Sequence, residues 1–354
     1  MTLLVVNAGS SSLKLSVLDS SDEVLAHDDI SDWSGDDAPI GELAARAGAI
    51  DTVGHRVVHG GTAFTGPVVV DDAVIDGLRE LTSLAPLHQP RAIAAIDAAR
   101  RALPGATHVA CFDTAFHATM PPAASTYALP GPWRARWPLR RFGFHGLSHA
   151  YAARRAAELA RRQLTELNIV TCHLGAGASL CAIEHGRSVD TTMGFTPLEG
   201  LVMATRAGSV DPGLVLWLMQ EAGLTSSEVE ENLEKRSGLV GLAGTADMRA
   251  VIERRAAGDA AATLAFDVYT HRLRREIGAM SAALEIVDVC VFAGGVGEHA
   301  PSVRAATHFP IDVAANESTT RDGEISAAGS GVRTFVVTAR EDLEVAREIR
   351  VLLA

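Results

Sequence analysis

The sequence predicts an α/β fold built from two duplicated domains, and three observations support this prediction. Segments typical of strands and of helices follow one another along the whole chain. The 354 residues are enough for about two domains at ~150 residues each. A turn of small residues followed by an outgoing strand occurs twice, near the start and near the middle of the chain. The composition, 47% hydrophobic and 21% charged, is that of an ordinary globular protein.

Runs of apolar and β-branched residues predict the strands, because such side chains suit a pleated and largely buried surface. The predicted strands are Leu3–Val6, Leu13–Leu18, Thr52–Val58, His108–Phe112, Asn168–Cys172, Ser179–Ile183, Val287–Phe292 and Thr334–Val337.

Apolar residues at helical spacing predict the helices between these strands. Asp211 and Pro212 are typical of an N-cap and a first turn, and they predict a further helix that ends at Gly223. The other predicted helices are Asp72–Leu84, Arg91–Leu103, Leu147–Gln163, Asp259–Leu284 and Glu341–Leu353.

The repeated motif is the evidence for duplication. "AGSSSLKLSVLD" begins at Ala8 and "GAGASLCAIEHG" at Gly175, and both join a small-residue turn to a leucine and an outgoing strand. Two copies indicate a duplicated domain with a ligand between the halves, although chance similarity of Gly/Ser turns is the alternative. The Pro- and Ala-rich segment Pro121–Trp133 is a candidate crossing between domains.

Charge, apolar runs and cysteine content indicate which partners and which cellular compartment to expect. The net charge of −12 argues against nucleic acid or an anionic membrane as a partner. We find no secretion signal, and no apolar run approaches the ~18 residues of a membrane span. The four cysteines form no CxxC pair, which indicates buried free thiols in the cytoplasm.

Three other motifs resemble known binding sites but lack a feature that each of those sites requires. "GTAFTGPV" at Gly61 has the glycine spacing of a P-loop but lacks its Lys and Ser/Thr. "GVGEHA" at Gly295 fits a dinucleotide pattern, yet no acidic residue ends a strand about 20 positions later. His145 and His149 have the spacing of helical metal ligands, but Gly143 and Gly146 favour a loop around His145.

Glycine-rich turns follow three of the predicted strands, at Asn7–Ser12, Gly175–Gly177 and Gly294–Gly297. Such turns let backbone amides approach phosphate oxygens, and open α/β sheets bind their ligands at strand ends. The pattern therefore favours a protein that binds a nucleotide and transfers its phosphoryl group.

Two arginines and one acid add to this interpretation. Arg56 lies on a strand, and Arg206 lies in a Gly/Ser turn after an apolar run. Surface salt bridges are the alternative for each arginine alone, whereas together they fit clamps for carboxylate and phosphoryl oxygens. Asp113 directly follows a predicted buried strand. An acid at this position is either a helix cap or a group that orients magnesium or a nucleophile.

Nine motifs, in order from residue 3 to about 353, resemble the acetate kinase family. They are "NAGSSSLK", "GHRVVHGG", "APLHQP", "FDTAFH", "RRFGFHGLSH", "HLGAGAS", "VDTTMGFTPLEGLVMATRAG", "VDPG" and "AGGVGE". The resemblance implies two duplicated ribonuclease-H-like domains of the actin-like ATPase type around a nucleotide cleft. It also implies that the protein transfers the γ-phosphoryl group of ATP to acetate, reversibly and in line, giving acetyl phosphate and ADP.

The resemblance assigns roles to particular residues. It implies that Asn7 and Glu341 bind Mg²⁺, or Mn²⁺, and that Lys14 contacts the nucleotide phosphates. Arg56 would bind the acetate carboxylate, beside an apolar pocket for the methyl group formed by Val58, Leu87, Phe144 and Pro197. Asp113 would be the catalytic acid, and His145 and Arg206 would stabilise the transferring phosphoryl group. The residues implied to bind the nucleotide are His173, Leu174, Gly175, Ala176, Gly177, Asp247, Met248, Arg249, Gly294, Gly295, Val296, Gly297 and Glu298.

Physical chemistry bears on the role of Asp113. Acetate is already ionised near pH 7, so no general base is needed to create the nucleophile. We therefore favour Asp113 as a group that orients metal or water over a proton acceptor.

The resemblance also implies a domain division and an oligomeric state. Residues 1–117 with about 343–354 would form the acceptor and metal domain, and 118–342 the nucleotide-binding and dimerisation domain of a homodimer. Three features depart from the usual family pattern. Ala176 replaces an asparagine, Arg340 precedes Glu341 where asparagine is common, and the segment between Asp19 and Asp51 is short.

Two alternative functions stay open on the sequence alone. The first is the same chemistry on propionate or butyrate, because one methylene changes binding by only about 0.8 kcal/mol. The second is a nucleotide-dependent binding protein of the same superfamily, against which Arg56 and the "FGFHG" motif argue.

Overall fold

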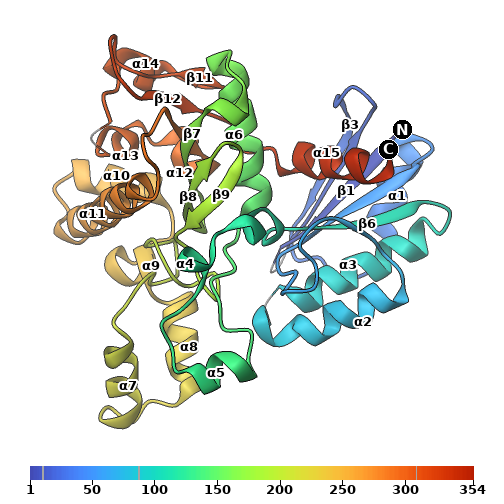
Figure 1. Cartoon of the computed structure of the whole chain (residues 1–354), viewed down its shortest axis with the longest axis horizontal. Helices are drawn as coiled ribbons and strands as arrows, with labels where there is room; N and C mark the ends of the chain where they lie inside the picture. Colours follow the sequence, from blue (N-terminus) through green and yellow to red (C-terminus); the bar gives the residue numbers. More distant parts are fainter. Residues whose placement is uncertain (10–11, 87, 308) are drawn as a thin grey trace. The chain divides into compact units, whose positions relative to one another are not determined.

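The computed structural model describes residues 1–9, 12–86, 88–307 and 309–354, which form two compact units. Each unit is built on its own six-stranded mixed sheet (Figure 1). Unit 1 consists of Met1–Ala118, Phe144–Tyr151 and Arg340–Ala354, and unit 2 of Thr119–Gly143 and Ala152–Ala339.

The sheet of unit 1 has the strand order β3-β2-β1-β4-β6-β5. β1, β2 and β3 are antiparallel neighbours, β4 and β6 run parallel to β1, and β5 is antiparallel to β6. The strands are β1 (Leu3–Ala8), β2 (Leu13–Leu18), β3 (Val24–Ile30), β4 (Thr52–Val57), β5 (Val68–Val69) and β6 (Thr107–Phe112).

Helices cover both faces of this sheet (Figure 1). One face packs on α1 (Ala38–Ala47), α2 (Asp72–Glu80) and α3 (Gln89–Ala102), and the 3₁₀ turn Leu81–Leu84 follows α2. The other face packs on α15 (Glu341–Leu353) and on the start of α6 (Gly146–Ala160).

Gly54 on β4 explains how closely α15 approaches the sheet. A Cβ atom at this position would lie 2.5 Å from side-chain carbons of both Val345 and Ile349. Only a residue without a side chain leaves room for α15, and the helix in turn carries Glu341 in its first turn.

The sheet of unit 2 has the order β11-β12-β10-β7-β8-β9. β7, β8 and β9 are antiparallel neighbours, β10 and β12 run parallel to β7, and β11 is antiparallel to β12. The strands are β7 (Asn168–Leu174), β8 (Ala178–Glu184), β9 (Arg187–Thr191), β10 (Val289–Ala293), β11 (Gly323–Glu324) and β12 (Arg333–Val336).

The longest helix of unit 2 is α11 (Ala260–Ala282), which packs on β7, β8, α9 and α10. The other elements of unit 2 are α4 (Pro122–Ser125), α5 (Gly131–Arg136), α7 (Pro212–Gln220), α8 (Ser226–Lys235), α9 (Gly238–Ala243), α10 (Met248–Ala256), α12 (Gly294–His299), α13 (Pro301–Ala305), α14 (Val313–Ser318) and a 3₁₀ turn at Leu164–Glu166.

The two sheets have the same topology, so the duplication is confirmed. β1 to β4 correspond to β7 to β10, and β6 with its antiparallel edge strand β5 corresponds to β12 with β11. The two copies of the repeated motif are the turns after β1 and after β7. Gly9 donates its N–H to the Ser12 carbonyl in one turn, and Gly175 to the Gly177 carbonyl in the other.

Several predicted bounds need correction. The helix expected to end at Gly223 ends at Gln220, and Gly223 has φ +72° in the following turn. The strand expected from Val287 begins at Val289, and the preceding residue Asp288 still bonds through its backbone to Asn168 and Arg333 of the neighbouring chain segments. The segment Pro121–Trp133 lies within unit 2 and contains α4.

Phe144–Tyr151 belongs to unit 1 although its sequence neighbours on both sides belong to unit 2. The cause is local, since Gly146 donates its N–H to the Asp113 carbonyl at 2.9 Å. Among the helices that the structure describes, none combines the length and the apolar composition that crossing a membrane requires.

Candidate functional site

Three predicted site residues stand side by side at the ends of unit 1 strands. Asn7 on β1 is paired with Lys14 on β2 and with Arg56 on β4. Directly paired residues of neighbouring strands project from the same face of a sheet, so the three side chains form a row.

Arg56 connects three other predicted residues, Asn7, Asp113 and Glu341. Its Nε and Nη2 donate to the two carboxylate oxygens of Asp113, at 3.0 and 2.8 Å. Its Nη1 donates to Asn7 Oδ1 at 3.3 Å and to Glu341 Oε2 at 3.2 Å. We call Asn7, Arg56, Asp113 and Glu341 the Arg56 cluster.

The Arg56 cluster is largely removed from water. The side chain of Asp113 is 2% exposed, and those of Arg56 and Glu341 are 18% and 19% exposed. Burial alone would lower the pKa of the Arg56 guanidinium, but the charges of Asp113 and Glu341 outweigh burial and raise this pKa above its ordinary value. Arg56 is therefore a permanent cation, and its hydrogen bonds hold it in one orientation.

His145 lies next to Asp113 through a close backbone contact. A Cβ atom at Gly146 would lie 2.1 Å from the Asp113 carbonyl oxygen, so only glycine permits this approach. His145 itself has φ +57°, a conformation that costs a non-glycine residue about 1 kcal/mol or more. The "FGFHG" motif thus brings His145 to the end of β6, where Asp113 follows.

The four predicted pocket residues are divided between the two units. Val58 and Phe144 lie in unit 1, Pro197 lies in unit 2, and Leu87 is outside the described residues. Phe144 is buried, with its ring edge-on to His59 at a centroid distance of 5.4 Å. The methyl pocket stays a prediction.

Lys14 is the most exposed of the predicted residues in unit 1. Its side chain is 55% exposed, and its Nζ lies 3.5 Å from a carboxylate oxygen of Asp29 on β3. Exposed ion pairs of this kind are weak, so Asp29 holds Lys14 only loosely.

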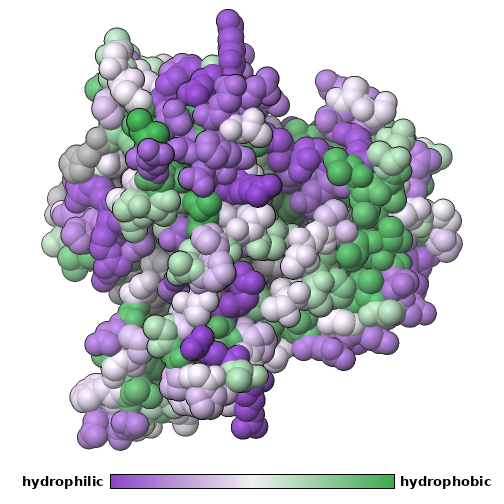
Figure 2. Space-filling view, viewed as in Figure 1, coloured by the Kyte–Doolittle hydropathy of each residue, from purple (hydrophilic) through white to green (hydrophobic). Residues whose placement is uncertain are grey.

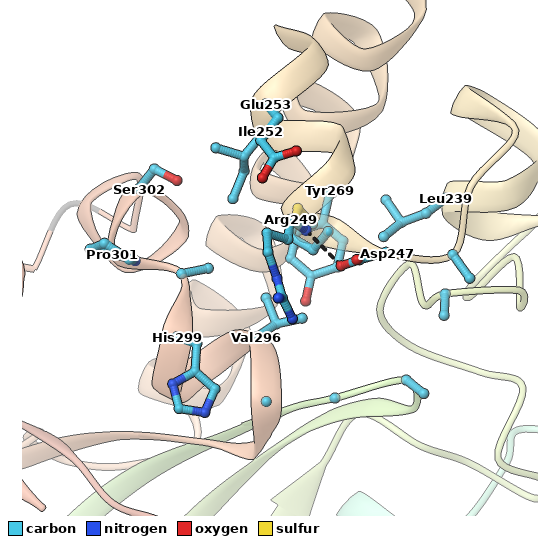
Figure 3. Close-up of a pocket in the computed structure, with 17 residues that line it drawn as sticks. Leu239, Asp247, Arg249, Ile252, Glu253, Tyr269, Val296, His299, Pro301 and Ser302 are labelled. Atoms are coloured by element: carbon cyan, nitrogen blue, oxygen red, sulfur yellow. Dashed lines mark hydrogen bonds between the residues drawn. The ribbon is translucent and has the colours of Figure 1, made fainter. Parts of the chain in front are cut away.

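A cavity of about 660 Å³ in unit 2 gathers many of the predicted nucleotide residues (Figure 3). In Figure 3 Arg249 extends from α10 across the cavity toward Val296 and His299 of α12, while Leu239, Tyr269 and Ile252 supply apolar wall. The predicted residues that line it are Gly175, Ala176, Asp247, Met248, Arg249, Gly295 and Val296.

Two of the predicted glycine turns meet at this cavity because β7 and β10 are parallel neighbours. Gly294 has φ +77°, and a Cβ atom there would lie 2.8 Å from the Leu174 carbonyl oxygen. Glycine therefore allows the chain after β10 to cross the end of β7.

The remaining predicted nucleotide residues do not line the cavity. Leu174, Gly294 and Gly297 are buried beneath it, and Glu298 accepts a hydrogen bond from the Ala339 amide at 3.0 Å. His173 pairs with Ser179 and Ala293 in the sheet, at the position that Asn7 occupies in unit 1, and Gly177 closes the turn after β7.

Arg206 also stands outside the cavity wall, in the loop before α7. Its Nε donates to Glu234 Oε2 at 3.0 Å, and both side chains are 18% exposed. The neighbouring residue Ala204 lines the cavity and donates its N–H to the Ala176 carbonyl.

Several residues in and around these sites were not predicted. Tyr269 and Leu239 line the cavity, and Glu234 is the ion-pair partner of Arg206. They lie on helices whose apolar or charged pattern is that of any amphipathic helix, so the sequence contained no signal for them. Gly54 did have a signal, since a glycine inside a strand marks a close approach.

Comparison with known proteins agrees with this fold. A model of the acetokinase family matches residues 40–347. The acetate kinase of Synechococcus sp. is 46% identical over 329 residues, covering 91% of this chain and 80% of that protein. The crystal structure of Porphyromonas gingivalis acetate kinase matches with a TM-score of 0.92 at 34% identity, covering 100% of both chains. A propionate kinase from Francisella tularensis matches with a TM-score of 0.91 at 32% identity, covering 98% of both.

The duplicated sheets, with their sites at the strand ends, define a two-domain α/β phosphotransferase. The family match then specifies the class further. This chain belongs to the acetokinase family, and the resemblance seen in its motifs is confirmed.

Proposed function

We propose that this protein is an acetate kinase, which transfers the γ-phosphoryl group of ATP to acetate and runs in reverse. The observation that carries the proposal is the Arg56 cluster, a partly buried cation held by two carboxylates and an amide at the strand ends of an acetokinase-family fold. In this proposal Arg56 meets the acetate carboxylate, and the cavity of unit 2 holds the nucleotide.

The central difficulty of the reaction is electrostatic, because an anionic acceptor must approach a polyanionic donor. Arg56, Lys14, His145 and Arg206 would supply positive charge or hydrogen-bond donors for the acceptor and for the transferring phosphoryl group. Asp113 accepts two hydrogen bonds from Arg56, which supports a role in orienting that arginine. Its role as a proton acceptor is not required, since acetate enters as the anion.

Kinases of this family work with a divalent metal and ATP. The oxygens of Asn7, Asp113 and Glu341 are hard donors, and Mg²⁺ commonly takes one or two carboxylates together with water and substrate phosphates. Among the described residues no group of three or more His, Cys, Asp or Glu side chains forms a metal cluster. We propose Asn7 and Glu341 as the Mg²⁺ contacts, and the ion, or Mn²⁺ in its place, would neutralise charge on the phosphates.

Hydroxylamine trapping tests this proposal directly. With ATP, Mg²⁺ and acetate, we expect the protein to form acetyl phosphate, which hydroxylamine converts to acetohydroxamate, together with an equal amount of ADP. ADP release without acetohydroxamate would contradict the proposal.

Propionate is the second candidate acceptor, favoured by the match to a propionate kinase structure. Pockets discriminate poorly against one methylene, by roughly 10- to 200-fold at best. The ratio of kcat/KM for acetate and propionate decides between the two acids, and we expect it to favour acetate.

We also propose a homodimer formed through unit 2. Its helix α7 has no buried residue and exposes Leu214, Leu216 and Trp217, at 47%, 54% and 55%. In Figure 2 hydrophobic residues lie among hydrophilic ones over this part of unit 2. Leu216→Glu should shift the sedimentation coefficient to that of a monomer, whereas an unchanged coefficient would exclude α7 from the interface.

A cytoplasmic location is likewise proposed. It is supported by the four cysteines, all of which are buried free thiols.

A further inference from the structure

A hydrogen-bonded network in unit 2 lies outside the residues discussed so far. Tyr127 Oη donates to Glu199 Oε2 at 2.6 Å and accepts the backbone N–H of Phe195 at 2.9 Å. Arg141 Nη2 donates to the other carboxylate oxygen of Glu199 at 2.7 Å. Each of the three side chains therefore contacts another through a polar atom, and Glu199 joins them.

The same network forms hydrogen bonds with the backbone of the loop that follows β9. Arg141 Nη1 donates to the carbonyl oxygens of Thr191, Thr192 and Met193, at 3.1, 3.1 and 3.0 Å. Together with the bond to the Phe195 amide, it holds the chain from the end of β9 into residues 192–198, the loop that contains Pro197.

Gly194 shows how tightly this loop is packed against the network. A Cβ atom there would lie 1.7 Å from Glu199 Oε2 and 2.2 Å from Tyr127 Oη. The network thus touches the loop through side chain and backbone, and any larger residue at 194 would break it.

The positive charge of Arg141 is balanced by the negative charge of Glu199. Burial alone would lower the pKa of Arg141, but the negative charge of Glu199 outweighs burial and raises it. Burial and the hydrogen bond to Glu199 raise the pKa of Tyr127, so its O–H remains a donor throughout the neutral range.

The loop also anchors the segment that leads to His145. The Gly194 carbonyl accepts the backbone N–H groups of Phe142 and Gly143, at 3.0 and 3.3 Å. The loop that contains the predicted pocket residue Pro197 is therefore also bonded through its backbone to Phe142 and Gly143, within unit 2.

We propose that Tyr127, Arg141 and Glu199 are positioning residues that fix the 192–198 loop and thereby set the acyl chain length that the enzyme accepts. This inference rests on the proposed function, in which Pro197 of this loop faces the acyl group. A loosened loop leaves more room, so larger carboxylic acids gain relative to acetate.

Tyr127→Phe tests the inference, since it removes one hydrogen-bond donor and one acceptor and keeps the ring. We expect the propionate-to-acetate ratio of kcat/KM to rise about three- to tenfold, with KM for ATP within about twofold of wild type. Hydrogen exchange of the Phe195 amide should accelerate, whereas amides of β7 and β8 should exchange as before.

Arg141→Lys provides a second variant with a matched control. Arg333 in the same unit also binds a carboxylate (Glu324) and a carbonyl oxygen (Ala160), and its guanidinium lies over an aromatic ring. Arg333→Lys should therefore lower stability as Arg141→Lys does but leave the acid preference unchanged. If Tyr127→Phe does not fold, Glu199→Gln takes its place.

An unchanged ratio in a folded variant, or equal changes in the Arg333 control, would overturn the inference. Failure of the proposed function is distinguishable, because the wild-type protein would then phosphorylate neither acid. In that case unchanged exchange of the Phe195 amide in Tyr127→Phe would overturn the positioning role as well.

Discussion

At the scale of single residues, the contacts within the Arg56 cluster stabilise and orient a largely buried guanidinium. A buried guanidinium is costly without partners, and here two carboxylates and an amide oxygen supply them. Four of its five N–H donors bind protein atoms among the described residues, and the fifth is on Nη2. In the proposed function this donor would meet the acceptor carboxylate, with the guanidinium already oriented.

Glu234 should affect catalysis through Arg206. Glu234 accepts a hydrogen bond from the Nε of Arg206, so Glu234→Ala should leave the Arg206 side chain without a fixed orientation. We expect kcat to fall roughly tenfold, with little change in KM for acetate. Glu231→Ala on the same helix is the control, since Glu231 pairs with Arg236 near the surface. Equal kcat values for the two variants would exclude this role.

Buried histidines should make unit 1 sensitive to acid. Burial lowers the pKa of His59 from 6.5 to about 4. Between these two values the unfolded chain binds more protons than the folded chain, so stability falls as pH falls through this window. The loss from His59 amounts to about 3 kcal/mol at pH 4, and burial lowers the pKa of His55 in the same direction.

Urea unfolding between pH 6.5 and 4.5 checks this prediction. His59→Gln should flatten the dependence of the unfolding free energy on pH compared with wild type. An identical slope in both proteins would show that His59 is accessible to protons in the folded state.

At the scale of secondary structure, the sequence predicted the central strands well and the edge strands poorly. The strand Leu13–Leu18 and the helix Glu341–Leu353 are confirmed at both bounds. Apolar residues recur at strand spacing throughout the first segment and at helical spacing throughout the second. The edge strands β3, β5, β9 and β11 were missed. β3 and β9 carry mixed polar residues, and β5 and β11 have two residues each, so all four lack the continuous apolar run of a central strand.

Gly54→Ala tests the coupling between α15 and the site. The added methyl group would overlap Val345 and Ile349, and overpacking of this kind costs about 1–3 kcal/mol. Because α15 carries Glu341, activity should fall as well. Gly41→Ala in α1 is the control, since nothing lies within 4 Å of its added methyl and the helix should gain about 0.5–1 kcal/mol.

Denaturant unfolding and kcat/KM, measured on both glycine variants, decide the outcome. If Gly54→Ala were as stable and as active as wild type, α15 would have no part in positioning Glu341.

At the scale of the whole molecule, the sequence predicted the duplication, and it named residues that the structure joins in the Arg56 cluster, but it did not indicate the contacts around them. Asn7 and Asp113 were singled out near the ends of apolar strands, where α/β sheets place their ligands, and Arg56 as an arginine on an apolar strand. Their roles stay predictions. Glu341 came only from the family resemblance. The partners Glu199 of Tyr127 and Glu234 of Arg206 are distant in sequence, and no local pattern fixes such pairs.

The most direct test of the account is the rate of acetate-dependent ADP formation in Arg56→Ala compared with wild type. Arg46→Ala is the matched control, because Arg46 also binds an aspartate in unit 1 but lies on the surface. We predict that Arg56→Ala lowers kcat/KM for acetate about 10²- to 10³-fold and that Arg46→Ala changes it less than twofold. A folded Arg56→Ala protein with wild-type kcat/KM would contradict the central claim, that a buried and pre-oriented cation receives the acceptor anion.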